Sequence, residues 1–554
     1  MNSELLPKII LLVLIVISYL TPLTSAGYEL VDWFTTDDAF YYFEIASNIA
    51  GGNGSTFDGV NKTNGYHPLW MMILIPVQFL SQGSLLLSLR LIVIVQLLFA
   101  MATGVLFYQF LRSSASVSTS LFMSCCWTLY QPIHSVVNNG TEAVINAFFL
   151  TLLLVAYQKY FKSEGRSFSS TRLLLLGLAA VGVLSSRLDN IFLVFSFGVL
   201  LSLASLKKKG VRRLPSSILE AGKEGLLFSL PSGIFLAGFL IWNQVFFGTW
   251  MPLSGQIKRF WGSLSETVYG APITGIGEFV GEFLAPQRTL GPWHILTNPL
   301  LDFVDSFQAN YYYGTLQVSA GFFVVIGIAV MVGYLLREQR EYVFQAIEEW
   351  AFIPLFAGAF FQILYYKLFG YLAPRSWYWI VEMLIIVVAF SIILEAGVRT
   401  LGELLPGVSR LMIPVLTVSA VMLVSSPYFR SLTQLGQDAQ AADHYYLHKT
   451  VWLEQRTTPG SIIGMTGAGT TAYFIEDRSI MNLDGLVNSA DYFHSLKRGQ
   501  AAEFVIQSGV NYIFGNQRIL METDPYRENY QEILQESDME GIFRDRLVLW
   551  GLDN

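Results

Sequence analysis

Two adjacent carboxylates, Asp37 and Asp38, follow the first apolar segment of the sequence. Ionised carboxylates beside a membrane are costly to desolvate, so such a pair indicates chemistry rather than packing. One carboxylate could accept the proton of an attacking hydroxyl group, while its neighbour orients it or binds a divalent cation. Asp37 could also cap a helix that begins near Ala39, since Asp is a favoured N-cap residue. Two carboxylates exceed what capping requires, and we predict that Asp37 and Asp38 are catalytic.

Two further residues could belong to the same site. Glu142 follows the polar segment 134–141, which we expect to lie between two apolar runs. A single acidic residue at the start of a helix also interacts favourably with the helix dipole, so Glu142 has a structural interpretation as well. His67 lies in the segment Gly65-Tyr66-His67-Pro68, whose composition predicts a shaped turn.

Three basic residues are candidates for binding a phosphate group. Arg375 is the strongest, because a guanidinium offers a fixed fork of donors to anionic oxygens, although it could instead anchor an interfacial aromatic belt. Lys258 or the adjacent Arg259 could meet a lipid phosphate or extend to the membrane surface. Arg187 shares a short turn with Asp189, and the two form either a structural ion pair or a ligand contact.

The composition identifies an integral membrane protein. Of 554 residues, 53% are hydrophobic and only 14% are charged, and the mean hydropathy is +0.48. The net charge of −7 equals that of residues 428–554, which contain 10 Lys/Arg and 17 Asp/Glu. This acidic tail argues against a nucleic-acid partner, which would require a basic surface. Cys125 and Cys126 are adjacent in an apolar run and are interpreted as packing residues.

Apolar runs predict about eleven membrane crossings. They cover residues 9–26, 85–111, 116–132, 142–161, 172–186, 190–206, 225–247, 317–337, 350–370, 376–396 and 411–427. The first run resembles a cleavable signal peptide in length, but we expect a retained helix because the remainder is membrane-embedded. Residues 68–80 are about 13 residues long against the roughly 20 needed to cross, so we expect them to lie on the outer face, with Trp70 at the interface.

Basic clusters set the orientation, since Lys and Arg concentrate in cytoplasmic loops. Such clusters occur at Lys159, Lys162, Arg166 and Arg172, and at Lys207–Lys209, Arg212 and Arg213. Placing both inside puts the acidic loop 27–84, the long loop 248–316 and Arg375 outside. All the candidate residues then share the external face.

The sequence predicts two domains, a membrane domain at 1–427 and an external domain at 428–554. In the second, short β-like runs at 461–465, 479–483, 512–514 and 546–550 alternate with helix-like segments at 438–455 and 499–508. We therefore expect an α-helical polytopic membrane protein with a small C-terminal α/β domain.

Residues 36–42 and 64–70 closely resemble the first external loop of GT-C glycosyltransferases, polytopic membrane enzymes that use lipid-linked sugars. Residues 242–254 also resemble the family, and residues 473–474 and 482–488 resemble the soluble domain of bacterial and archaeal members. The resemblance implies that Glu142 lies near the first-loop acids and that Arg187, His67 and Lys258 contact the donor. We expect Arg375 to contact the donor as well, and Asp37 and Glu142 could hold Mg, Mn or Ca.

These inferences predict a membrane glycosyltransferase. The expected donor is a polyprenyl-phosphate sugar, and the acceptor a hydroxyl group of a glycan, lipid or protein. The reaction would occur on the external face of the cell membrane, with no nucleic acid involved. The alternative is a transporter or flippase for lipids or sugars, but transporters place ionisable residues near the membrane midplane and often contain inverted repeats. Neither feature is visible in the sequence.

Overall fold

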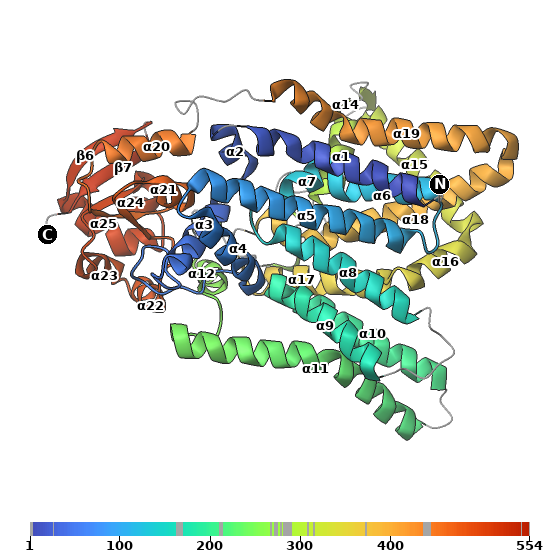
Figure 1. The fold of residues 1–554 in the computed structure, drawn as a ribbon, viewed down its shortest axis with the longest axis horizontal. Helices are drawn as coiled ribbons and strands as arrows, with labels where there is room; N and C mark the ends of the chain where they lie inside the picture. The colour runs from blue at the N-terminus through green and yellow to red at the C-terminus, as the bar shows by residue number, and fades with distance from the viewer. Residues whose placement is uncertain are drawn as a thin grey trace.

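The structure, a computed structural model, describes residues 4–25, 27–161, 170–209, 214–265, 267, 269–270, 275–277, 280, 291–306, 310–313, 316–371, 374–435, 445–544 and 546–552. Long helices lie roughly side by side in one part of the molecule, and a sheet domain covers one end of them (Figure 1). Part of the predicted loop 248–316 lies outside the described residues, as do Lys162, Arg166, Arg212 and Arg213.

Each predicted apolar run corresponds to a helix. The long helices are α1 (Leu5–Thr24), α5 (Leu85–Leu111), α6 (Val117–Leu129), α8 (Ala143–Phe161), α9 (Ser170–Ser186), α10 (Ile191–Lys209), α11 (Leu214–Phe247), α15 (Ala320–Glu338), α17 (Phe352–Leu368), α18 (Ile380–Leu404) and α19 (Pro406–Ser431). Many large apolar side chains on these helices are exposed, as expected of surfaces that face lipid. The first helix packs against α5 and α6, and its Leu11, Ile15 and Tyr19 are fully buried.

Within the described ranges, five helices are long and apolar enough to cross a membrane. The helix α16 (Arg340–Glu349) and α17, bent by 62° at their junction, would add a sixth span. Five more apolar helices have 10–17 residues, which is short for a crossing. The protein is thus a multi-pass helical membrane protein, and the number of eleven crossings remains a prediction.

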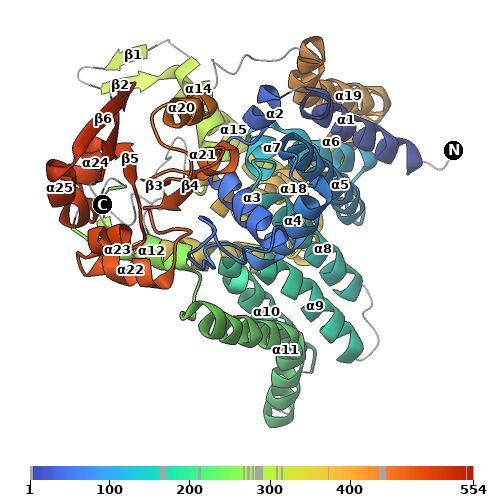
Figure 2. The same cartoon turned by 60° about the vertical axis from the view of Figure 1, so that its left-hand side comes forward.

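Shorter elements connect the long helices. They are α2 (Tyr28–Trp33), α3 (Asp37–Ala50), α4 (Pro68–Ser81), α7 (Gln131–Val137), η1 (Leu188–Asn190), α12 (Leu253–Trp261), α14 (His294–Ser306), the hairpin β1 (Asn310–Tyr313) and β2 (Leu316–Ser319), η3 (Ser376–Tyr378) and η4 (Leu432–Gln434). The helices α3, α4 and α12 gather at the end of the bundle that meets the sheet (Figures 1 and 2).

The C-terminal part is a small α/β domain, as predicted. Its sheet has the order β4–β3–β5–β7–β6, and the strands are β3 (Ile462–Met465), β4 (Ser479–Asn482), β5 (Tyr512–Asn516), β6 (Asp538–Phe543) and β7 (Leu547–Gly551). The first three strands pair in parallel and the last two antiparallel. Its helices are α20 (Tyr445–Glu454), α21 (Gly469–Phe474), α22 (Ala490–Lys497), α23 (Ala501–Gln507), α24 (Gln517–Glu522) and α25 (Tyr526–Glu536).

Two apolar cores join this domain to the bundle. The larger core continues from the membrane helices into the sheet, where it includes Ile463 and Met465 of β3. The smaller core contains Leu253, Ile257 and Trp261 of α12 together with residues of α22 to α25. Because α12 belongs to the core of the C-terminal domain, that domain is packed onto the membrane part rather than tethered to it.

One expectation about aromatic residues was wrong, and one alternative is contradicted. Trp70 is fully buried, and its indole N–H donates to the Gly140 carbonyl at 2.9 Å instead of lying at the membrane surface. Trp377 and Trp379 are also buried, so the segment around Arg375 is not a lipid-facing aromatic belt. In both cases the aromatic side chains pack inward, and Trp377 lines the cavity described below.

Candidate active site

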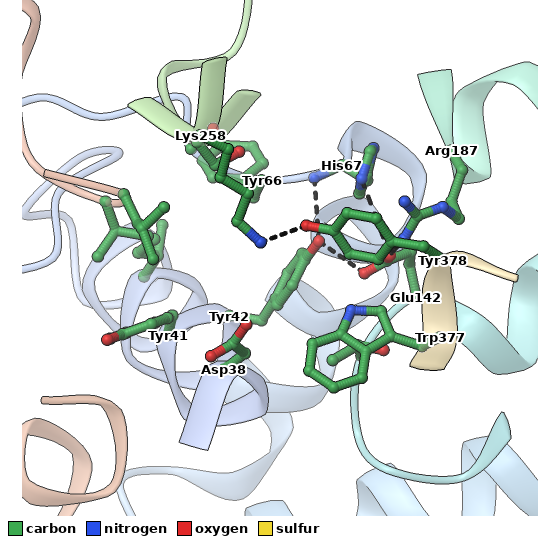
Figure 3. Close-up of a pocket in the computed structure, with 16 residues that line it drawn as sticks. Asp38, Tyr41, Tyr42, Tyr66, His67, Glu142, Arg187, Lys258, Trp377 and Tyr378 are labelled. Atoms are coloured by element: carbon green, nitrogen blue, oxygen red, sulfur yellow. Dashed lines mark hydrogen bonds and ion pairs between the residues drawn. The ribbon is translucent and has the colours of Figure 1, made fainter. Parts of the chain in front are cut away.

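A small cavity lies where the first long loop, α12, η3 and the C-terminal domain meet. Its volume is about 60 Å³, room for a few water molecules, so a larger ligand must displace side chains on entering. The lining residues are Asp38, Tyr41, Tyr42, Ile45, Gly65, Tyr66, His67, Thr141, Glu142, Arg187, Ser254, Lys258, Trp377, Tyr378, Leu486 and Val487. Five of the predicted site residues are therefore brought together: Asp38, His67, Glu142, Arg187 and Lys258 (Figure 3).

The Asp38 carboxylate faces this cavity from the first turn of α3. Its side chain is partly exposed, and no residue in the described ranges donates a hydrogen bond to its oxygens. Burial raises the pKa of Asp38, the positive charges of Lys258 and Arg375 lower it, and the charges of Asp37 and Glu142 raise it further. The net upward shift makes Asp38 a better proton acceptor than an ordinary aspartate.

Asp37 points away from the cavity, toward the C-terminal domain. One carboxylate oxygen accepts the Gly469 N–H at 2.9 Å, and the other accepts the Thr470 N–H at 2.7 Å and the Thr470 hydroxyl at 2.8 Å. The side chain of Thr36, not that of Asp37, caps α3 by accepting the Asp38 N–H at 3.3 Å. The alternative that Asp37 caps α3 is therefore wrong, since its carboxylate is bound to the start of α21.

Glycines allow this close contact between the first loop and the C-terminal domain. A Cβ atom on Gly469 would collide with the Asp37 carbonyl, and one on Gly65 would collide with the Leu486 carbonyl. Backbone therefore packs directly on backbone at two places beside the cavity. The second contact brings Leu486 and Val487 of the C-terminal domain into the cavity wall.

Asp484 adds a third carboxylate to this junction. It follows β4 and accepts hydrogen bonds from the Gly467 N–H at 2.8 Å, the Asn482 amide at 3.3 Å and the Tyr41 hydroxyl at 3.4 Å. Burial raises the pKa of Asp484 to about 6, while its hydrogen bonds lower it and the nearby charges of Asp38 and Asp37 raise it. Asp484 thus connects the carboxyl end of the parallel strands, a common location of ligand sites in α/β sheets, to α3.

Glu142 and Arg187 form a buried ion pair on the opposite wall. Both side chains are buried, and a guanidinium nitrogen of Arg187 donates to Glu142. Arg187 also donates twice to Asp189, at 2.8 and 3.1 Å, so the structural ion pair, one of the two alternatives for this turn, is present. Asp189 in addition accepts the Tyr366 hydroxyl at 2.6 Å, and a group held by so many donors positions other residues rather than moving protons.

His67 lies beside this network. Its Nε2 is 3.8 Å from Glu142, and its buried Nδ1 has no partner within the described part of the protein. Burial lowers the pKa of His67, and the charge of Glu142 opposes that effect without reversing it. The imidazole is therefore neutral at neutral pH and can donate or accept a hydrogen bond in the cavity.

Lys258 reaches the cavity from α12. Its ammonium group donates to the Tyr378 hydroxyl and lies 4.7 Å from the centre of that ring. The Arg187 guanidinium lies 4.3 Å from the same ring centre, so Tyr378 lies within contact distance of both cations. Figure 3 shows the Lys258 amine directed at the Tyr378 hydroxyl across the cavity. Two cations that converge on one polar side chain form a suitable surface for an anion.

Arg375 is not part of the cavity wall, although its charge acts on Asp38 and on Tyr269. It precedes η3 directly and is partly exposed. Within the described ranges no hydrogen bond or ion pair engages its side chain. The structure thus places Arg375 near the first-loop acid Asp38, on which Lys258 also acts, but outside the set of residues that line the cavity.

The two acids considered as metal ligands do not fit a metal site. The Asp37 oxygens accept N–H and O–H groups, and the Glu142 oxygens accept the Tyr42 hydroxyl at 2.8 Å and an Arg187 N–H. Donors in these positions compete with a cation. Among the described residues there is no group of three or more His, Cys, Asp or Glu side chains arranged to hold a metal ion.

Several residues of the site were not predicted from the sequence. The Tyr42 hydroxyl donates to Glu142 and accepts the backbone N–H of His67 at 3.2 Å. Tyr378 contacts both Lys258 and Arg187. Tyr42 and Tyr378 lie in the same segments as the candidates Asp38 and Arg375. Their position beside charged candidates was the feature of the sequence that could have identified them as site residues. Asp484 lies in segment 482–488, where the sequence indicates a family resemblance but no chemical role.

No family model matches the sequence, and no curated protein does. Solved structures do share its fold. The oligosaccharyltransferase of Archaeoglobus fulgidus in its apo form aligns with a TM-score of 0.51 and 12% identity over 95% of this chain and 71% of that one. ArnT from Cupriavidus metallidurans bound to undecaprenyl phosphate aligns with a TM-score of 0.50 and 11% identity over 98% of this chain and 97% of that one.

Both structures have the GT-C fold, and the protein described here has the same fold. The alignments extend over nearly the whole chain, so they include the membrane helices and the C-terminal domain. At 11 and 12% identity they establish the architecture and not the role of any residue.

Proposed function

We propose that the protein is a glycosyltransferase that moves a sugar from a polyprenyl-phosphate donor to an acceptor hydroxyl group at the external face of the membrane. The observation that carries this proposal is the cavity in which Asp38, a carboxylate without a hydrogen-bond donor in the described ranges, faces the same space as Lys258. A base and a cation on one cavity suit an acceptor hydroxyl and a phosphate leaving group. The similarity to ArnT, which was solved with undecaprenyl phosphate bound, supports a lipid phosphate as the carrier.

Asp38 is the proposed general base. As the acceptor oxygen forms its bond to the anomeric carbon of the sugar, the hydroxyl proton passes to the Asp38 carboxylate. The bond between the anomeric carbon and the phosphate oxygen breaks, and polyprenyl phosphate leaves with the bonding electron pair. The raised pKa of Asp38 favours this proton transfer near neutral pH, because the carboxylate holds the proton more strongly.

Lys258 and Arg375 are the proposed phosphate ligands. Lys258 can exchange its hydrogen bond to Tyr378 for one to a phosphate oxygen, and Arg375 has no partner in the described ranges that it must give up. Both would stabilise the charge that develops on the departing phosphate. Arg187 also lines the cavity, but Glu142 and Asp189 already accept its hydrogen bonds, so it positions the wall and contributes positive charge.

His67 and Glu142 are proposed to shape the subsite for the sugar. The neutral His67 can hydrogen-bond a sugar hydroxyl through its unpartnered Nδ1, and Glu142 orients both Tyr42 and Arg187. Asp37 is proposed to act indirectly, by holding α21 against the first loop. No step of this mechanism passes through a metal ion, because Asp37 and Glu142 do not fit one.

The direct test is transfer by the purified full-length protein. It should be incubated with a panel of radiolabelled polyprenyl-phosphate sugars and with membrane extracts as the source of acceptor. We expect label to move to an acceptor from at least one donor, and the product should disappear with Asp38→Asn. Movement of intact donor across vesicle membranes without release of sugar would instead indicate a flippase.

A further inference from the structure

A second, larger cavity lies outside the candidate active site, between α12, the C-terminal end of α17 and α22. Its volume is about 680 Å³, within the range of small-molecule sites. The lining residues are Gln256, Arg259, Phe260, Gly262, Ser263, Lys367, Leu368, Phe369, Gly370, Phe493 and Lys497. None of them also lines the cavity that contains Asp38.

Three cations from three separate elements line this cavity: Arg259, Lys367 and Lys497. None of its described lining residues is acidic. Three positively charged side chains on one cavity favour an anion as its ligand.

Aromatic side chains hold two of these cations at the cavity. The Arg259 guanidinium lies 5.6 Å from the centre of the Phe369 ring. The Lys497 ammonium lies 5.2 Å from the Phe493 ring centre and 5.9 Å from that of Phe260. Cation–π contacts of this kind orient the charges before a ligand arrives.

Two glycines fix the geometry of the cavity. A Cβ atom on Gly262 would collide with the Gly370 carbonyl, and Gly370 has a φ of +65°, a conformation that side chains disfavour. The end of α12 therefore packs directly on the end of α17. This contact keeps Arg259 of α12 and Lys367 of α17 on the same cavity.

An apolar stripe on α17 leads to the cavity from the membrane part. Ile353, Phe356, Phe360 and Leu368 lie three, four and eight residues apart, so they share one face of the helix. Their exposed fractions are 58, 50, 39 and 63%. A lipid chain lying along this face would place its headgroup near Lys367, because Leu368 itself lines the cavity.

We propose that this cavity binds the anionic phosphate headgroup of a membrane lipid, whose chains lie along the exposed face of α17. The cavity supplies the positive charge, and the stripe supplies the apolar surface that distinguishes a lipid from free phosphate. The proposal does not rest on the proposed glycosyltransferase activity, since it concerns different residues and a binding equilibrium.

The test is calorimetric titration of the purified full-length protein in neutral detergent at low ionic strength, where charge interactions are least screened. The probes are short-chain phosphatidylglycerol, short-chain phosphatidylcholine and inorganic phosphate. Phosphatidylglycerol should bind at least about tenfold more tightly than either of the others, because it alone combines net negative charge with apolar chains. The double variant Lys367→Ala/Lys497→Ala should weaken that binding by about tenfold or more.

Arg498→Ala is the matched control, since Arg498 follows Lys497 directly but does not line the cavity, and it should leave the affinity nearly unchanged. The charge-only double variant Lys367→Gln/Lys497→Gln replaces the alanine pair if the latter fails to fold. Equal affinities of the wild type and a folded double variant would overturn the proposal. Equal binding of phosphatidylcholine would overturn the role of charge, and equal binding of inorganic phosphate would overturn the role of the lipid chains.

Discussion

Asp37 and Asp38 are adjacent in the sequence, but their carboxylates face different regions of the molecule. Asp37 is fixed by three hydrogen bonds from Gly469 and Thr470 at the junction with the C-terminal domain. Asp38 faces the cavity and is influenced by the charges of Lys258 and Arg375. Two adjacent residues of the same type can therefore have different roles. Asp37 holds two domains together, and Asp38 is available for chemistry.

The largest effect is expected from Asp38→Asn. An amide cannot accept the hydroxyl proton, so transfer should fall by about 100-fold or more. Steady-state transfer from a labelled polyprenyl-phosphate sugar measures the loss. The thermal unfolding midpoint in detergent serves as the control, and it should change little because the Asp38 oxygens have no donor in the described ranges. Full activity of a folded variant would mean that Asp38 is not the base.

Arg375→Ala should have the next largest effect. Arg375 is proposed to bind the donor phosphate, so removing its charge should raise the KM for the donor or lower turnover by about tenfold. Arg375→Lys keeps the charge but loses the fork of donors, so it should recover only part of the activity. The KM for the acceptor should change much less than that for the donor. Unchanged donor kinetics in both variants would leave the phosphate to Lys258 and Arg187.

Asp37→Asn should act mainly on stability. The amide group would turn a donor toward the N–H of Gly469 or Thr470, which leaves a partly buried hydrogen bond unmade and costs about 1 kcal/mol. Limited proteolysis should then release the C-terminal domain faster than in the wild type. Glu503→Gln, an exposed change in the same domain, is the matched control and should have no such effect. Wild-type resistance of Asp37→Asn would remove its role at the junction.

A smaller, pH-dependent effect is expected for Asp484→Asn. The pKa of Asp484 is raised to about 6, so the folded state binds this proton more tightly than the unfolded state does. Stability from this group is therefore present at low pH and is lost as the pH rises through about 6. The variant should unfold at a higher temperature than the wild type at pH 8, and the difference should shrink below pH 4. A difference independent of pH would contradict this assignment.

The sequence predicted the helices well because their signal is local. The apolar run at 85–111 has the same bounds as α5, and all four predicted strands correspond to β3, β4, β5 and β7. The strand β6 was missed because it lies at the edge of the sheet and is mostly exposed, so it lacks the alternation of a half-buried strand.

The site was predicted only in part, because its decisive contacts are distant in the sequence. Asp38, Glu142, Arg187, His67 and Lys258 were recognised from residue type and resemblance, and they line one cavity. The partners of Asp37 are 432 and 433 residues away, so no local pattern shows that its carboxylate is bound to α21. The packing of α12 into the core of the C-terminal domain was not predicted for the same reason, because its contacts are also distant in the sequence.

We propose a structural role for Asp37 and a role as general base for Asp38. The most direct test is single-turnover transfer by Asp37→Asn and Asp38→Asn, each saturated with the same donor. Saturation removes differences in donor affinity, and a folded fraction measured on each sample corrects for differences in stability. We expect transfer by Asp38→Asn to be slower than transfer by Asp37→Asn by at least about tenfold, because Asp38 is the proposed acceptor of the proton. A rate for Asp38→Asn equal to or above that of Asp37→Asn would contradict it.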